Sequence, residues 1–444
     1  MPKNYGNQRD IPSVDFLIEN LDSNNIPRPL LSRLVRDELK KIRKTEKVPS
    51  RSEIIDLLNK KKSDLILSRI KPIINGTGVV IHTNLGRSPI DIPDGSGGYL
   101  NLEFDLSNGK RGDRAIYVEK CLATLLNTQA GMFVNNCAAA LMLILKILRQ
   151  DKNKVIISRG ELVQIGGGFR LPEILQSTGA ELCEVGTTNK TTIADYEESI
   201  DSNTGLILKV HRSNFSMDGF VGSPTRKELG LLAKKKRIPL IEDLGSSVLH
   251  SYDCFAEPDL NPRRVLKEGV DLVCFSGDKL MGGAQSGVIA GKKKLINSLK
   301  KQPFYRAFRC DKMVLTVMQD VLEKYLNREV DSLKINKIIT EDLHPLKQRA
   351  EKIVSELKGI KLDCDIMPCT STVGGGSSPR AKINSIALQL SSNKLTAIQI
   401  AAKMRNAELP IIGLIKGGKY CLDLRTIFPE QDKFLLSRIR EIFN

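Results

Sequence analysis

Apolar residues recur at helical spacing through the first 71 residues of this 444-residue chain. The stretch Asp10–Asn20 alternates apolar and polar positions with a helical period, and Ser50–Ile70 does the same. Between them, Arg28–Lys44 follows a proline and carries one apolar stripe, made of Leu30, Leu31, Leu34, Val35 and Leu39. The pattern predicts a small helical module that ends near Lys71 and Pro72.

From about residue 73 to residue 325, short apolar runs alternate with helical stretches such as Ala138–Leu148 and Thr225–Lys236. The predicted strands are Gly131–Val134, Lys154–Ser158, Glu181–Val185, Gly205–Val210, Ile238–Glu242, Val270–Phe275 and Gly287–Ala290. This alternation predicts an α/β domain over residues 72–325, with a mainly parallel sheet that helices cover on both faces. Ligands of such domains bind beyond the carboxyl ends of the strands.

Residues 326–444 contain both helical and strand patterns of apolar residues. The helical patterns are Asp342–Leu357 and Ala397–Ala407. The strand patterns are Lys382–Gln389 and an expected pair of strands, Ile411–Leu414 and Lys419–Asp423. A loop rich in Gly and Ser at 374–378 interrupts them. We expect a small α+β domain here.

The charge of the chain changes the picture of its partners. The formal net charge is +17, which favours a polyanionic partner such as nucleic acid. Residues 1–71 hold 16 Lys and Arg against 10 Asp and Glu, so the helical module carries +6 of this charge. Lysine runs such as Lys60–Lys62 are also typical of solvated helix ends, so the charge alone leaves the partner open.

Cysteine usage and the length of apolar runs indicate the compartment. The nine cysteines contain no CxxC pair and no even framework, which argues against a zinc site and against a disulfide scaffold. Free thiols fit a reducing cytosol. The amino-terminal segment lacks an apolar signal core, and no apolar run approaches about 18 residues. We expect a cytoplasmic protein with no membrane segment and no metal.

The strongest local motif surrounds Lys279, in Leu272-Val-Cys-Phe-Ser-Gly-Asp-Lys-Leu-Met-Gly-Gly283. A buried strand runs into Ser-Gly, and the lysine follows at the carboxyl end of the strand. A lysine that forms a Schiff base with pyridoxal phosphate (PLP) needs such a partly desolvated place. Ser276 is a candidate for hydrogen bonding to the cofactor phosphate. The alternative is a surface lysine in a glycine-rich loop.

A second motif, Pro239-Leu-Ile-Glu-Asp-Leu-Gly-Ser-Ser247, is a strand that ends in Asp243-x-Gly. PLP draws electrons only while its pyridine nitrogen stays protonated, and a carboxylate beside that nitrogen keeps it so. Asp243 precedes Lys279 by 36 residues, enough for one helix and one strand. Alone, Asp243 is more typical of a capping residue; together with Lys279 it indicates a PLP site.

A third motif, Phe133-Val-Asn-Asn-Cys-Ala-Ala-Ala140, joins a strand to a strongly helical run. The free backbone N–H groups and the dipole of a helix N-terminus attract anions. Asn136, Cys137 and Ala138 are therefore candidates for holding the cofactor phosphate, although many helices begin in this way.

Taken together, the motifs resemble the family of bacterial selenocysteine synthases, the L-seryl-tRNA(Sec) selenium transferases. The resemblance runs nearly the whole chain, through 74–87, 158–170, 184–189, 209–214 and 276–279 to 420–425. It implies a fold-type I PLP-dependent transferase and a homo-oligomer built from dimers into a ring, possibly a decamer. It also implies an N-terminal module that grips tRNA. The implied reaction converts seryl-tRNA(Sec) to selenocysteinyl-tRNA(Sec) with selenophosphate, through an aminoacrylyl-tRNA intermediate.

The resemblance also implies residues that bind the phosphate of selenophosphate: Arg87, and the pair Arg306 and Arg309. At a spacing of three, the pair is expected to share one helix face. A surface salt bridge is the alternative for each arginine. His211 follows a predicted strand and is a candidate for stacking on or bonding to the cofactor ring, with a purely structural histidine as the equal alternative. His82 fits a structural role better.

The chain departs from the family between Arg87 and residue 102. The family carries a helix there, whereas 88–101 is short, rich in Pro and Gly, and leaves no room for one. Two other functions stay open. One is a PLP lyase acting on a small phosphorylated amino acid or amino sugar; relatives of that kind tend to lack the N-terminal module. The other is an inactive RNA-binding scaffold, against which the retained Lys279, Asp243 and arginines argue.

Overall fold

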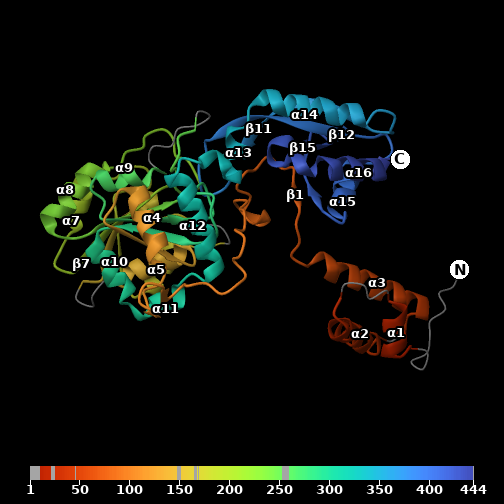
Figure 1. Ribbon diagram of the computed structural model, residues 1–444, viewed down its shortest axis with the longest axis horizontal. Helices are drawn as coiled ribbons and strands as arrows, with labels where there is room; N and C mark the ends of the chain where they lie inside the picture. Colours follow the sequence, from red (N-terminus) through yellow and green to blue (C-terminus); the bar gives the residue numbers. More distant parts are fainter. Residues whose placement is uncertain are drawn as a thin grey trace. The chain divides into compact units, whose positions relative to one another are not determined.

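The computed structural model describes residues 11–21, 26–45, 47–147, 152–164, 168, 170–252 and 260–443 (Figure 1). The chain divides into two compact units. One is Met1–Ile73 with Arg405–Pro410, and the other is Ile74–Met404 with Ile411–Asn444. The division proposed from sequence at residues 325 and 326 remains a prediction, since both of those parts fall within the second unit.

The N-terminal unit is built from three helices, α1 (Val14–Asn20), α2 (Arg28–Ile42) and α3 (Arg51–Leu67). The Ser50 hydroxyl accepts from the Glu53 N–H and the Glu53 carboxylate accepts from the Ser50 N–H, a capping box that starts α3. The buried core of the unit includes Leu17, Leu31, Val35, Leu39, Ile54 and Leu58. The helical module expected from the apolar stripes is confirmed.

A seven-stranded sheet lies at the centre of the second unit, in the order β4-β10-β9-β8-β7-β5-β6. Its strands are β4 (Ala130–Val134), β5 (Lys154–Ser158), β6 (Glu181–Val185), β7 (Thr204–Val210), β8 (Leu240–Gly245), β9 (Leu272–Ser276) and β10 (Gly287–Gly291). Of these described strands, β10 alone runs in the opposite direction to the others. The mainly parallel sheet predicted from sequence is confirmed.

Alternate residues of these strands enter two separate cores, because successive side chains of a strand point to opposite faces. One core joins Phe133 and Val273 to α4 (Ile116–Leu126), α8 (Arg226–Lys236) and α12 (Lys312–Leu326). The other joins their neighbours Met132 and Leu272 to α5 (Cys137–Leu145), α6 (Leu171–Ser177) and α10 (Lys293–Lys300). Helices therefore cover both faces of the sheet (Figure 1).

A second, antiparallel sheet has the order β11-β12-β15-β14. It consists of β11 (Asp363–Thr372), β12 (Lys382–Ser391), β14 (Leu414–Lys416) and β15 (Lys419–Asp423). The helices of this region are α14 (Leu343–Glu356), α15 (Ala397–Arg405) and α16 (Asp432–Phe443). The expected pairing of Ile411–Leu414 with Lys419–Asp423 is corrected in part: β13 (Ile411–Ile412) pairs in parallel with β1 (Ile74–Asn75).

Short elements complete the second unit. They are β2 (Phe104–Asp105), β3 (Lys110–Arg111), α7 (Ile193–Ser199), α9 (Pro262–Lys267), α11 (Pro303–Phe308) and α13 (Lys334–Thr340). Residues 88–101 contain turns and no helix, as their composition predicted. Within the part of the chain that the structure describes, no helix combines the length and the apolar character needed to cross a membrane.

Candidate active site

Lys279 lies in the turn that follows β9, and its amine is held by a loop distant in sequence. Its Nζ donates to the carbonyl oxygen of Gly376 at 2.7 Å. Gly376 has φ of +75°, and a Cβ built there would lie 2.6 Å from Nζ, so this position requires glycine. Burial lowers the pKa of the Lys279 amine, and the charge of Arg87 lowers it further, whereas Cys137 opposes the shift. The amine is therefore easier to deprotonate than that of a surface lysine.

Asp243 lies on β8, directly beside β9 in the sheet. Its Cα pairs in register with Cys274 of β9, two residues before that strand ends. The Asp243 carboxylate accepts from the Gly245 N–H at 2.9 Å. Burial raises the pKa of this carboxyl group, while the Gly245 hydrogen bond and the charge of Lys279 oppose the rise. Lys279 thus follows the end of β9, and Asp243 lies near the end of the adjacent strand β8. Their joint role in a PLP site stays a prediction.

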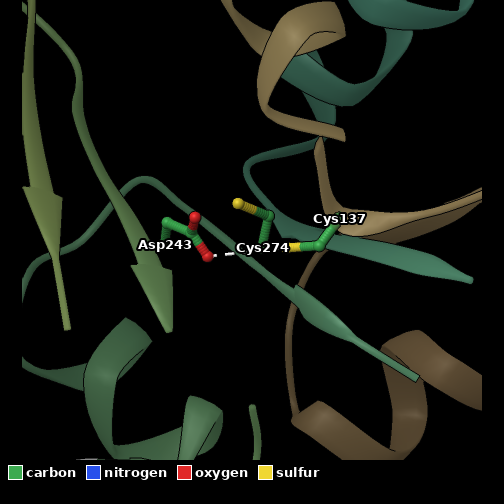
Figure 2. A group of neighbouring side chains, drawn as sticks. All are labelled: Cys137, Asp243 and Cys274. Atoms are coloured by element: carbon green, nitrogen blue, oxygen red, sulfur yellow. Dashed lines mark hydrogen bonds between the residues drawn. The ribbon is translucent and has the colours of Figure 1, made fainter. Parts of the chain in front are cut away.

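The helix expected to bind phosphate begins beside Asp243. Asn136 is the N-cap of α5, and its side-chain oxygen accepts from the Ala139 N–H at 2.8 Å. The Cys137 Sγ donates to the Asp243 Oδ1 at 3.5 Å (Figure 2). Because the Asn136 side chain is used for capping, an anion here would depend on backbone N–H groups, including that of Ala138.

Ser276 and His211 also lie at this edge of the sheet. Ser276 is the last residue of β9 and is buried. His211 directly follows β7, and its backbone N–H donates to the Asp243 carbonyl oxygen at 2.8 Å. The structure thus brings the main chain of His211 to Asp243. The roles assigned to Ser276 as a phosphate ligand and to His211 as a ring partner stay predictions.

Arg87 is placed next to the lysine. Its Nη1 donates to both carboxylate oxygens of Asp278, at 3.0 Å and 2.9 Å, and Asp278 precedes Lys279 in the chain. Arg87 has φ of +65°, which is uncommon for a residue with a side chain. The preceding segment lies along the loop that holds Lys279, since the Ile81 N–H donates to the Val373 carbonyl at 2.7 Å.

The geometry expected for Arg306 and Arg309 is corrected. Helix α11 ends at Phe308, and Arg309 has an extended backbone, so the two arginines do not share a helix face. Arg306 is exposed, whereas the Arg309 Nη1 donates to the Glu103 carboxylate at 3.0 Å. The Asn135 N–H donates to the Phe308 carbonyl at 2.9 Å, so this segment still reaches the start of α5.

Four residues of the site were not predicted from the sequence. The sequence placed Gly376 only in a loop and Asp278 only in the motif around Lys279, and it did not single out Glu103. Cys274 was missed because its nearness to Asp243 depends on strand pairing, which no spacing rule reveals. Part of the resembling motif at 158–170, residues 165–167 and 169, lies outside the described residues.

The arrangement fits PLP. It offers an amine whose pKa burial lowers, a carboxylate near that amine, and a helix N-terminus with free backbone N–H groups. These are the three requirements of the cofactor: a point of attachment, a partner for the ring nitrogen and a seat for the phosphate. Lys279, Asp243 and the residues 136–138 would hold these parts.

Comparison with known proteins agrees with this geometry. The sequence profile of the L-seryl-tRNA selenium transferase family matches residues 73–428. The L-seryl-tRNA(Sec) selenium transferase of Clostridium perfringens is 41% identical over 399 residues, covering 87% of this chain and 85% of the relative. That of Aquifex aeolicus is 37% identical and covers 98% of this chain and 99% of the relative.

Among solved structures, D-glucosaminate-6-phosphate ammonia-lyase superposes with a TM-score of 0.56 at 20% identity, covering 84% of this chain and 96% of the other. At that identity the likeness concerns the fold, which is the fold-type I architecture expected from sequence. The family profile spans most of the chain, and the curated relatives align over most of their length. The chain therefore belongs to the L-seryl-tRNA selenium transferase family.

Proposed function

We propose that this protein converts seryl-tRNA(Sec) to selenocysteinyl-tRNA(Sec), with PLP as cofactor and selenophosphate as selenium donor. The observation that carries the proposal is that Asp243 lies near the end of β8 and Lys279 follows the end of the adjacent strand β9, in a chain of this family. PLP supplies an electron sink for charge that develops at the α-carbon of an amino acid.

Lys279 has two tasks in this reaction. Its Nζ would hold the cofactor, and in the presence of substrate it would be free to act as a base. Its lowered pKa then suits the free amine to remove the proton from the seryl α-carbon. Asp243 would keep the ring nitrogen of the cofactor protonated. Loss of the seryl hydroxyl as water leaves the β-carbon open to selenium.

Arginines bind the phosphate of selenophosphate in this scheme. Arg87 is the best supported, because its ion pair with Asp278 places its guanidinium beside the residue that carries the cofactor. Its side chain keeps 35% of its exposure, so a dianion can approach it. Arg309, held by Glu103, and the exposed Arg306 complete the proposed set.

The N-terminal helical module is proposed to bind the tRNA. Its net charge of +6 and its independent core support electrostatic binding of the tRNA phosphates.

We further infer a homo-oligomer built from dimers into a ring. A run of exposed large apolar side chains supports an interface between copies: Ile92, Tyr99, Leu100, Phe104, Leu106, Ile116 and Tyr117. Eight described cysteines are free, which suits a reducing cytoplasm.

The visible absorbance of the purified, PLP-loaded chain tests the proposal. It should change on addition of seryl-tRNA(Sec), and should not change with the uncharged tRNA or with free serine. A spectrum that does not change with seryl-tRNA(Sec) but changes with a phosphorylated amino sugar would contradict the transferase and favour the small-molecule lyase. A colourless protein on which borohydride fixes no cofactor would indicate the inactive scaffold.

A further inference from the structure

Two thiols and a carboxylate meet beside the proposed cofactor site (Figure 2). The Cys137 Sγ, the Cys274 Sγ and an Asp243 carboxylate oxygen all lie within 4.8 Å of one another. Cys274 is fully buried on β9, and Cys137 opens α5. The Cys137 Sγ donates to the Asp243 carboxylate at 3.5 Å. The three groups come from separate elements and converge on one point.

This donor set matches the preferences of a thiophilic divalent cation. Zinc binds cysteine sulfur, histidine nitrogen and carboxylate oxygen, in most cases with four ligands in a tetrahedron. With Zn–S bonds of about 2.3 Å, two sulfurs of a tetrahedron lie about 3.8 Å apart. The observed separations need at most about 1 Å of contraction to reach that geometry.

We propose that Cys137, Cys274 and Asp243 form a binding site for Zn²⁺ in the chain that has not yet received its cofactor. Both thiols release their protons to solvent as their sulfurs bind the metal, and a water molecule completes the tetrahedron. Cys137 is partly exposed, which gives the ion a route in.

The site excludes PLP, because both ligands need Asp243. A carboxylate oxygen bound to zinc cannot serve the protonated ring nitrogen. This consequence rests on the proposed role of Asp243 in cofactor binding, whereas the metal site itself does not. Zinc would therefore hold the chain in an inactive form that PLP reverses.

Cobalt(II) is the probe, because thiolate ligands give it a charge-transfer absorption that zinc lacks. The full-length chain, freed of PLP and kept reduced, is titrated with Co²⁺. We expect one site per chain with thiolate absorption, which added Zn²⁺ abolishes. Cys137→Ser and Cys274→Ser should each weaken Co²⁺ binding at least about tenfold. The matched control, Cys121→Ser, alters a buried cysteine of α4 and should bind as the parent does.

Cys274 is buried, so its variant needs a test of folding. Retention of PLP binding by Cys274→Ser shows that the fold survives, and Cys137→Ala provides an independent second variant. Addition of PLP to the cobalt form should abolish the thiolate absorption as the cofactor binds. Equal Co²⁺ binding by the parent and both serine variants would overturn the site. Simultaneous binding of PLP and cobalt would overturn the exclusion. The transferase proposal is tested separately, since no tRNA enters this experiment.

Discussion

Lys279 and Asp243 respond to burial in opposite senses. Burial lowers the pKa of the amine and raises the pKa of the carboxyl group, because in each case it penalises the charged form. The charge of each group partly opposes the pKa shift that burial causes in the other. In the proposed function, the protonated ring of the cofactor would provide a positive charge beside Asp243 and favour its ionised form.

Replacement of the proposed attachment lysine gives the first prediction. Lys279→Ala should lower kcat by about 1,000-fold or more, since both cofactor attachment and proton removal depend on its Nζ. Borohydride reduction followed by peptide mass spectrometry should locate the cofactor on Lys279 in the parent and nowhere in the variant. The control Lys301→Ala alters an exposed lysine and should behave as the parent. Cofactor fixed on another lysine would contradict the assignment.

Glu103 provides a second prediction, through pH. The hydrogen bond from Arg114, with the nearby charges of Arg309 and Arg111, holds the pKa of this carboxyl below its usual value. A depressed pKa stabilises the fold above the unfolded pKa of about 4.3 and loses that effect as pH falls below it. Glu103→Gln should therefore destabilise the protein at pH 7, by less than about 1 kcal/mol because the group is partly exposed.

Denaturant unfolding at two pH values checks this effect. The difference between Glu103→Gln and the parent should be present at pH 7 and should shrink as pH falls and the Glu103 carboxyl group becomes protonated. A destabilisation of equal size at both values would mean that packing, and not charge, is responsible. Because Arg309 loses its partner, the variant should also show a higher KM for selenophosphate.

At the scale of elements, the loop at 374–378 orients the lysine. Gly376→Ala should destabilise the chain by about 1–2 kcal/mol, because its φ is positive, and should also push on the Lys279 amine. The matched control is Gly359→Ala, which has φ of +91° but nothing within 4 Å of its new Cβ. Both variants should lose similar stability in thermal unfolding, and only Gly376→Ala should bind PLP more weakly. Equal PLP affinity of the two variants would contradict a role of this loop in PLP binding.

The sequence predicted the elements of the central sheet far better than their contacts. Buried parallel strands are continuous apolar runs, so β5 was located to the residue. The bounds of β6, a partly exposed edge strand, were also predicted to the residue. The ten-residue strand β11 was missed because Pro368 interrupts it and its apolar residues are few. The structure explains this composition: β11 is an edge strand, where proline is tolerated.

The site was predicted to the extent that its residues sit in local motifs. Lys279, Asp243 and Asn136 each follow or end a strand, so their convergence at one edge of a parallel sheet could be expected. The bond from Lys279 to Gly376 joins residues 97 positions apart. The cluster of Cys137, Asp243 and Cys274 depends on strand order and register. Cysteine spacing, which argued against a metal site, carries no information on such ligands.

At the scale of the whole molecule, positive charge is spread over both units, and the N-terminal unit has a core of its own. We therefore propose that the N-terminal unit binds tRNA and that the second unit carries out the reaction. Replacement of Lys60, Lys61 and Lys62 by Ala should weaken tRNA binding and lower its salt dependence. The log–log slope should fall by up to about 0.9 for each phosphate that the replaced lysines no longer neutralise.

The same replacement in Lys234, Lys235 and Lys236, at the end of α8, removes equal charge from the other unit. We expect this control to change the slope less, and both variants to keep PLP. Filter binding of labelled tRNA across a range of salt concentrations measures the slopes. Equal reductions in the two variants would indicate a general effect of net charge and would contradict a dedicated module.

The most direct measurement of the central claim is the transfer of radioactive selenium from selenophosphate to tRNA. The PLP-loaded full-length chain is incubated with seryl-tRNA(Sec), and the amino acid released from the tRNA is identified. The account predicts labelled selenocysteine with the parent chain, none with Lys279→Ala, and none when the tRNA is uncharged. Absence of label with a parent chain that binds both PLP and seryl-tRNA(Sec) would contradict the proposed function.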